Sequence, residues 1–207
     1  MARENLNYPN DHLRQLIAQQ AARLMAEDGI HDYAYAKKKA GRQLGVSENS
    51  ALPTNAEIEE EIRLYHEIYN ADEQPIELEK LRKAALITMQ LFAQFNPHLT
   101  GSVLDGSAGK FSQTNIHLFA DSAKEVEIFL LNQQIPYESS DKSYRLSDKP
   151  SKDKKDKVRK TVTVFALETE FGLQKLSVFD VDDLRVAAKN TSNSERLDLA
   201  GVQALFK

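Results

Sequence analysis

Residues 97–131, PHLTGSVLDGSAGKFSQTNIHLFADSAKEVEIFLL, contain the most regular pattern in the chain. They read as a strand, a glycine-rich turn at Gly101–Ser102, a second strand and an amphipathic helix. Apolar and polar residues alternate over residues 115–120, which is the period of a strand with one buried face. Asp121 or Ser122 is suited to cap the helix that follows. The sequence therefore predicts a β-turn-β-α unit at the centre of the chain.

This layout resembles the nucleotidyltransferase superfamily, in which a Gly-Ser pair ends one strand and two alternating carboxylates lie on the next. The resemblance covers about residues 97–186. It implies an α+β fold, with a helical N-terminal region packed on a small mixed β-sheet of nucleotidyltransferase-like type. The helical region itself is similar to an extension found in bacterial proteins with the same degenerate domain.

The residues at the metal-binding positions differ from the family pattern. Asn115 and His117 stand where the family has two acidic residues, and the third acidic position is taken by Lys175 or Ser177. Magnesium prefers hard oxygen ligands such as carboxylates. The resemblance thus implies a retained scaffold without its metal site, and we expect no catalytic residue, no metal and no cofactor.

The same region could still bind a ligand. Backbone N–H groups of a glycine-rich turn can hold a phosphate, with help from a lysine in the loop. The alternative is a turn that only reverses the chain. As a metal ligand His117 would favour zinc over magnesium, although a single strand histidine is more often structural. The predicted contacts to a nucleotide or a phosphorylated small molecule are Gly101, Ser102, Ser107, Lys110, Asn115 and His117.

A second hypothesis is an active nucleotidyltransferase with displaced carboxylates, using Mg²⁺ or Mn²⁺. Asp180 and Asp182 follow the third-carboxylate region, and Asp105 lies in the glycine-rich loop. The alternative is that Asp182 and Asp183 cap a following helix, which is the commoner role of such a pair.

The N-terminal region predicts four helices. They begin near Asn10, Asp32, Thr54 and Ile76, and the last ends at Asn96 because a proline follows. Residues 37–42 of the second helix carry three lysines and an arginine, which allows a third hypothesis, a nucleic-acid adaptor. A solvated helix surface is the commoner meaning, and the net charge of −4 makes nucleic-acid binding the weaker expectation.

Two strands are predicted after the central unit, over residues 159–168 and 173–181, with Gly172 at the turn between them. Val162, Val164 and Ala166 are expected on the buried face. The polar segment 139–157 lacks periodicity and is expected to be a mobile loop.

Composition restricts the class further. The 207 residues contain no cysteine, which excludes disulfides and thiol chemistry. With 41% hydrophobic residues and no apolar run of membrane-spanning length, the chain is expected to be cytoplasmic and not to bind a membrane, with export as the alternative. The expected organisation is a helical region over 1–96, a nucleotidyltransferase-like domain over 97–188 and a tail over 189–207. The expected function is a degenerate nucleotidyltransferase-like protein that binds a nucleotide, a phosphate or a protein partner.

Overall fold

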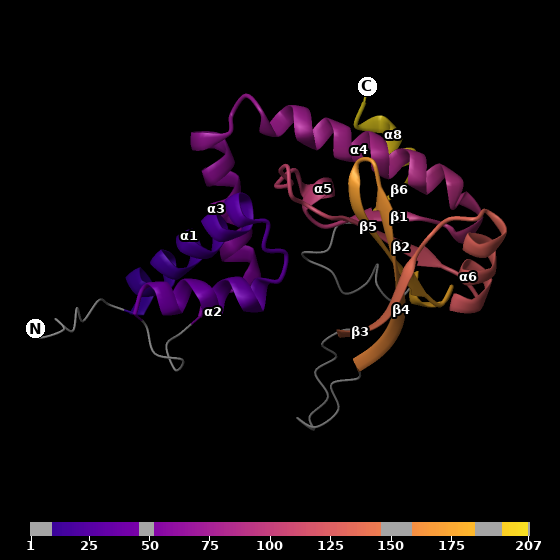
Figure 1. Ribbon diagram of the computed structural model, residues 1–207, viewed down its shortest axis with the longest axis horizontal. Coiled ribbons are helices and arrows are strands. Elements are labelled where there is room, and N and C mark those ends of the chain that lie inside the picture. Colours follow the sequence, from indigo (N-terminus) through magenta and orange to yellow (C-terminus); the bar gives the residue numbers. More distant parts are fainter. Residues whose placement is uncertain (1–9, 46–51, 146–158, 185–195, 207) are drawn as a thin grey trace, which may run out of the picture. The chain divides into compact units, whose positions relative to one another are not determined.

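The computed structural model describes residues 10–45, 52–145, 159–184 and 196–206 (Figure 1). The described part is α+β, with seven α-helices and one six-stranded mixed sheet. The chain forms two compact units. The first comprises residues 1–76 with 109–111, and the second comprises residues 77–108 with 112–207.

The first unit is built from three helices: α1 (Asn10–Asp28), α2 (Tyr33–Gln43) and α3 (Asn55–Tyr69). The side chain of Asp32 begins α2 by accepting a hydrogen bond from the backbone N–H of Tyr35 at 2.7 Å. All three helices contribute apolar side chains to one core. Its buried members are Ile17, Ala18, Ala21, Ala22, Leu24, Ala36, Ala40, Ile58 and Ile62.

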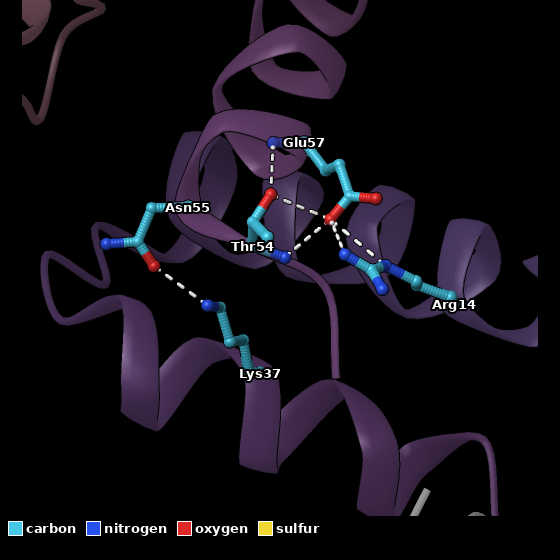
Figure 2. Close-up of polar contacts among 5 residues, drawn as sticks. All are labelled: Arg14, Lys37, Thr54, Asn55 and Glu57. Carbon is cyan, nitrogen blue, oxygen red and sulfur yellow. Dashed lines mark hydrogen bonds and ion pairs between the residues drawn. The ribbon is translucent and has the colours of Figure 1, made fainter. Parts of the chain in front are cut away.

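The start of α3 is held by a capping box, which Figure 2 shows. The N–H of Glu57 donates to the hydroxyl of Thr54 at 3.2 Å, and the N–H of Thr54 donates to Oε2 of Glu57 at 2.6 Å. Arg14 of α1 reaches the same oxygen through Nη2 at 2.7 Å. One carboxylate therefore satisfies the helix end and joins α1 to α3.

Residues 109–111 belong to the first unit because they pack on its helices. A Cβ added at Gly109 would lie 2.7 Å from Cε1 of His66, so only glycine fits there without a shift. The ring of Phe111 lies against Gly29, whose φ of +66° also favours glycine.

The second unit contains the sheet, with strand order β3-β4-β5-β2-β1-β6. Among the described strands only β2 and β5 pair in parallel, and the other neighbours are antiparallel. The strands are β1 (His98–Thr100), β2 (Thr114–Phe119), β3 (Glu138–Arg145), β4 (Arg159–Thr169), β5 (Gly172–Phe179) and β6 (Leu197–Asp198).

One face of this sheet carries the main core. It is covered by α4 (Gln74–Leu91), α6 (Ala123–Asn132) and α8 (Leu199–Ala204), and Figure 1 shows α4 running alongside the sheet. A 3₁₀ turn (Ala93–Phe95) follows α4, and Asn96 ends it in the left-handed conformation at φ 46°. The largest fully buried members of this core are Met89, Phe92, Leu99, Val103, Ile116, Leu118, Val126, Leu130, Phe165 and Leu176.

Several sequence predictions are confirmed. The helices over 10–28, 33–43 and 55–69 begin and end within a residue or two of their expected positions. The β-turn-β-α unit is present, with a short helix α5 (Ser102–Asp105) in the turn. The predicted hairpin is β4 and β5, which pair from Val164↔Ser177 to Thr169↔Gly172.

One prediction about strands is wrong, and a second is only partly confirmed. Residues 139–145, expected in a mobile loop, form most of β3; residues 146–157 lie outside the described residues. The face assignment on β4 is also incomplete, because Phe165 and Leu167 enter the main core. Val162 and Val164 pack instead in a second, smaller cluster with Phe119 and Phe179 on the opposite face of the sheet.

The C-terminal tail contributes more than its weak apolar pattern indicates. Val202 of α8 is fully buried in the main core, and Asp198 caps α8 by accepting the N–H of Gly201 at 2.8 Å. At the helix start expected near Asp182, Asp183 and Leu184 are helical, and the residues that follow, 185–195, lie outside the described part of the chain. Within the described residues, no helix is both long and apolar enough to cross a membrane.

Candidate functional site on the sheet

The candidate site lies on the sheet face opposite the main core, which we call the His117 face. It comprises Asn115, His117 and Phe119 of β2 with Lys175, Ser177 and Phe179 of β5. The parallel register sets these residues in pairs, Asn115↔Lys175, His117↔Ser177 and Phe119↔Phe179. Side chains of paired residues point to the same face. Lys175 and Ser177, the two candidates for the third acidic position, therefore lie beside Asn115 and His117.

Neighbouring strands extend this face. His98 pairs with His117 and Thr100 pairs with Asn115 across the β1–β2 ladder. The hydroxyl of Thr100 also donates to the carbonyl of Asn115 at 3.4 Å. On the other side, Lys142 of β3 pairs with Val162 of β4, so Lys142 lies on the His117 face as well.

Gly101 brings the turn close to Asn115. Its φ of +73° is a conformation that favours glycine, and the position of its absent Cβ lies 3.5 Å from Nδ2 of Asn115. Of the predicted ligand residues on β2, Asn115 therefore lies beside the turn, whereas His117 pairs with His98 at the other end of the β1–β2 ladder.

His117 is a neutral group in a positive field. Burial lowers its pKa to about 3, with further lowering by Arg196, Lys142 and His98. Its ring centroid lies 4.6 Å from that of Phe179. An imidazole with this pKa is uncharged at neutral pH and offers nitrogen rather than carboxylate oxygen.

Lys175 has the same kind of environment. Burial lowers its pKa, and the charge of Lys142 lowers it further. The charges that lower these two pKa values come from Lys142, Arg196 and His98. Such a field attracts anions and repels divalent metal ions.

The third cation, Arg196, lies against aromatic rings. Its guanidinium carbon is 5.5 Å from the ring centroids of both Phe119 and Phe179, which are themselves stacked with centroids 5.9 Å apart. These contacts are in the range of cation–π interactions. Because Leu197, the next residue, pairs with Leu99, the β6 strand carries Arg196 to the sheet.

Most backbone N–H groups of the glycine-rich turn are used within the turn. Leu104 and Asp105 donate to the carbonyl of Gly101, and Gly106 and Ala108 donate to the carbonyl of Ser102. The N–H of Ser107, a buried residue, donates to Oδ1 of Asp105 at 2.8 Å. The turn is thus held by its own hydrogen bonds, in which the backbone N–H groups of residues 104–108 are the donors.

Lys110 does not group with the sheet. It belongs to the first unit, where its ammonium lies 5.6 Å from the ring centroid of Phe111. Of the six predicted ligand residues, Lys110 thus contacts Phe111 and the backbone of Ser107 contacts Asp105.

The acids of the displaced-carboxylate hypothesis have local partners. Asp180 and Asp183 both accept hydrogen bonds from Nζ of Lys160, the Asp183 contact at 2.5 Å. Oδ2 of Asp183 also accepts the N–H of Asp180 at 3.2 Å, while Asp182 is exposed in the same turn. Among the described residues no group of three or more histidine and acidic side chains is arranged to hold a metal ion.

The basic run on α2 is divided among different partners. Nζ of Lys37 donates to Oδ1 of Asn55 at 2.8 Å (Figure 2), and Lys39 pairs with Asp28 at 3.0 Å. Lys38 lies between them in sequence, and consecutive residues of a helix point about 100° apart. Lys37 and Lys39 of this run thus contact different partners.

Sequence reasoning missed Lys142 and Arg196 as members of the site. Lys142 lies in a polar segment that gave no strand signal, and Arg196 lies in the tail over 189–207, before its apolar residues. Only the pairing of β3 with β4 and of β6 with β1 brings them to this face.

Comparisons with family models, with curated proteins and with solved structures give no match for this chain.

Proposed function

We propose that this protein is a catalytically degenerate, nucleotidyltransferase-like binding module, and that its His117 face binds a phosphate-bearing anion without a metal ion. The observation that supports this most is the placement of cations on one face of the sheet: the strand register sets Lys142 on the His117 face, and the guanidinium carbon of Arg196 lies 5.5 Å from the ring centroids of Phe119 and Phe179 on that face. Lys175 adds a further cation in register with Asn115.

The proposed chemistry follows from the residue types. Lysine ammonium groups donate hydrogen bonds to phosphate oxygens, and the Asn115 amide adds a neutral donor. A neutral His117 can donate one N–H to the same anion. Metal-assisted nucleotidyl transfer needs carboxylates that hold the ions at the triphosphate. The side chains at these positions are an amide, an imidazole, an ammonium and a hydroxyl.

Titration calorimetry of the purified full chain with ATP tests this proposal. We expect binding in EDTA and weaker binding in excess Mg²⁺, because the cation neutralises the phosphates that the lysines recognise. An active member of the family would show the opposite dependence.

Lys175→Gln removes one cation from the His117 face and should weaken binding about tenfold, the typical value of a charged hydrogen bond. The matched control is Lys83→Gln, which removes an exposed lysine paired with Glu79 on α4. Metal-dependent pyrophosphate release that survives Asn115→Ala and His117→Ala but is lost in Asp105→Ala or Asp180→Ala would reject the proposal and favour the displaced-carboxylate enzyme.

A further inference from the structure

The inference rests on the proposed function and concerns what the His117 face recognises. We propose that it binds an extended phosphate chain, the feature shared by nucleoside triphosphates and inorganic polyphosphate, and does not recognise the nucleoside. Two observations support this: the aromatic rings of the face are covered, and its cations are spread along the sheet.

The rings that could stack on a base are Phe119 and Phe179. They are only 3% and 2% exposed, and Arg196 lies 5.5 Å from the centroid of each. His117 packs on Phe179 at 4.6 Å, and His98 packs edge-on to Phe119 at 5.2 Å. Base recognition by stacking needs an exposed ring face. Each of these two rings already packs against other groups of the protein.

The cations are distributed over several strands rather than gathered at one point. Lys142 is on β3 and Lys175 is on β5, with β4 between them. Their β4 neighbours are Val162 and Ala166, so they are two strand spacings apart and four residues offset, roughly 16 Å between backbones.

The two ammonium groups still influence each other, since Lys142 lowers the pKa of Lys175. An anion with several phosphates in a row can contact both groups, whereas a single phosphate contacts one. An ammonium is also a compact charge with rotatable donors, which does not impose the fixed geometry needed to distinguish one base from another.

The test is a calorimetric series on the full chain in EDTA with inorganic phosphate, AMP, ADP, ATP, tripolyphosphate, adenosine and a dT oligonucleotide. We expect affinity to increase with the number of phosphates, tripolyphosphate to bind within threefold of ATP, and adenosine not to bind. Lys142→Gln should weaken tripolyphosphate binding about tenfold and phosphate binding much less. Lys124→Gln, an exposed lysine paired with Glu127 on α6, is the control.

Three results would overturn the inference while leaving an anion-binding protein: ATP at least tenfold tighter than tripolyphosphate, measurable binding of adenosine, or an oligonucleotide that binds more tightly than the phosphate chain. Equal loss of phosphate and tripolyphosphate affinity in Lys142→Gln would also overturn it, because the two lysines would then act as one point charge. The absence of binding by every anion in the series would reject the proposed function itself.

Discussion

At the scale of single residues, the clearest consequence of the structure concerns His117. Its folded-state pKa of about 3 lies below the ordinary value of 6.5, so the unfolded chain takes up this proton first as the pH falls. The contribution of His117 to stability is therefore complete above about pH 6.5 and decreases below it, by about 1.4 kcal/mol per pH unit.

His117→Gln should remove the decrease in stability that protonation of His117 causes below pH 6.5. We expect the free energy of unfolding of the variant to depend less on pH between 6 and 4 than that of the parent, measured by urea denaturation at each pH. His12→Gln removes an exposed histidine of α1 and serves as the control. Parallel pH profiles for the parent and the His117 variant would mean that His117 is not buried as described.

Glu57 makes the stability fall with decreasing pH in the same direction as His117, but over a lower pH range. Hydrogen bonds from Arg14 and Thr54 lower its pKa to about 2, below the ordinary value of 4.5. Its stabilising contribution is therefore present above about pH 4.5 and is lost as the pH falls toward 2. Glu57→Gln should be less stable than the parent at pH 7 and equal to it near pH 2.

The matched control for Glu57 is Glu60→Gln, which removes an exposed carboxylate of α3 that pairs with Arg63 of the same helix. Its difference from the parent should be small at every pH, as for most surface ion pairs. A Glu57 variant that matched the parent at pH 7 would show that the contact with Arg14 contributes nothing to folding.

At the scale of elements, the parallel pairing of β2 and β5 positions the His117 face, and β4 supports it from the side. Val164 is 4% exposed and packs with Phe119 and Phe179. Val164→Asp places a carboxylate among these apolar groups and should lower the melting temperature strongly, because an unpaired buried charge is costly.

Thr161→Asp, at an exposed position on the same strand, is the control for Val164→Asp and should change the melting temperature little. The comparison separates burial from strand propensity, since both variants introduce the same residue into β4. If both variants had the melting temperature of the parent, the cluster of Val164 with Phe119 and Phe179 would not be a packed core.

The elements also show how far sequence reasoning reaches. The helices of the first unit were predictable because Asp32 and Thr54 are capping residues followed by helical periodicity. The hairpin of β4 and β5 was predictable from alternation around Gly172. In contrast, β3 is an edge strand whose described side chains from 138 to 143 are all exposed, so its sequence ESSDKSYR has no apolar period.

Other features depend on tertiary pairing and have no local signal. Val164 and Phe165 are both apolar, and alternation alone cannot say that one enters the main core and the other the second cluster. Asn115 and His117 were placed together from their spacing on one strand. Lys142 and Arg196 join them only through strands far away in the sequence.

At the scale of the whole molecule, the described residues form two large hydrophobic cores besides the small cluster of Phe119, Val162, Val164 and Phe179. One joins α1, α2 and α3, and the other joins the sheet to its helices, with no residue in common. Ile116 and Leu118 of β2 belong to the larger core and alternate along the strand with Asn115 and His117. The larger core therefore packs on the side of the sheet opposite the His117 face.

This organisation gives a prediction about cooperativity that two matched substitutions test. Ile58 of α3 and Ile116 of β2 are both fully buried, one in each core, and truncation to alanine should cost about 2–5 kcal/mol in either place. If each unit is stabilised by its own core, Ile58→Ala should reduce amide hydrogen-exchange protection in α1, α2 and α3 while leaving β2 and β5 protected. Ile116→Ala should do the reverse. A phosphate chain bound to the His117 face should then restore protection to the sheet of Ile116→Ala, since a ligand of the folded state stabilises it by mass action. Equal loss of protection in both units for either variant would show instead that the chain unfolds as one cooperative structure.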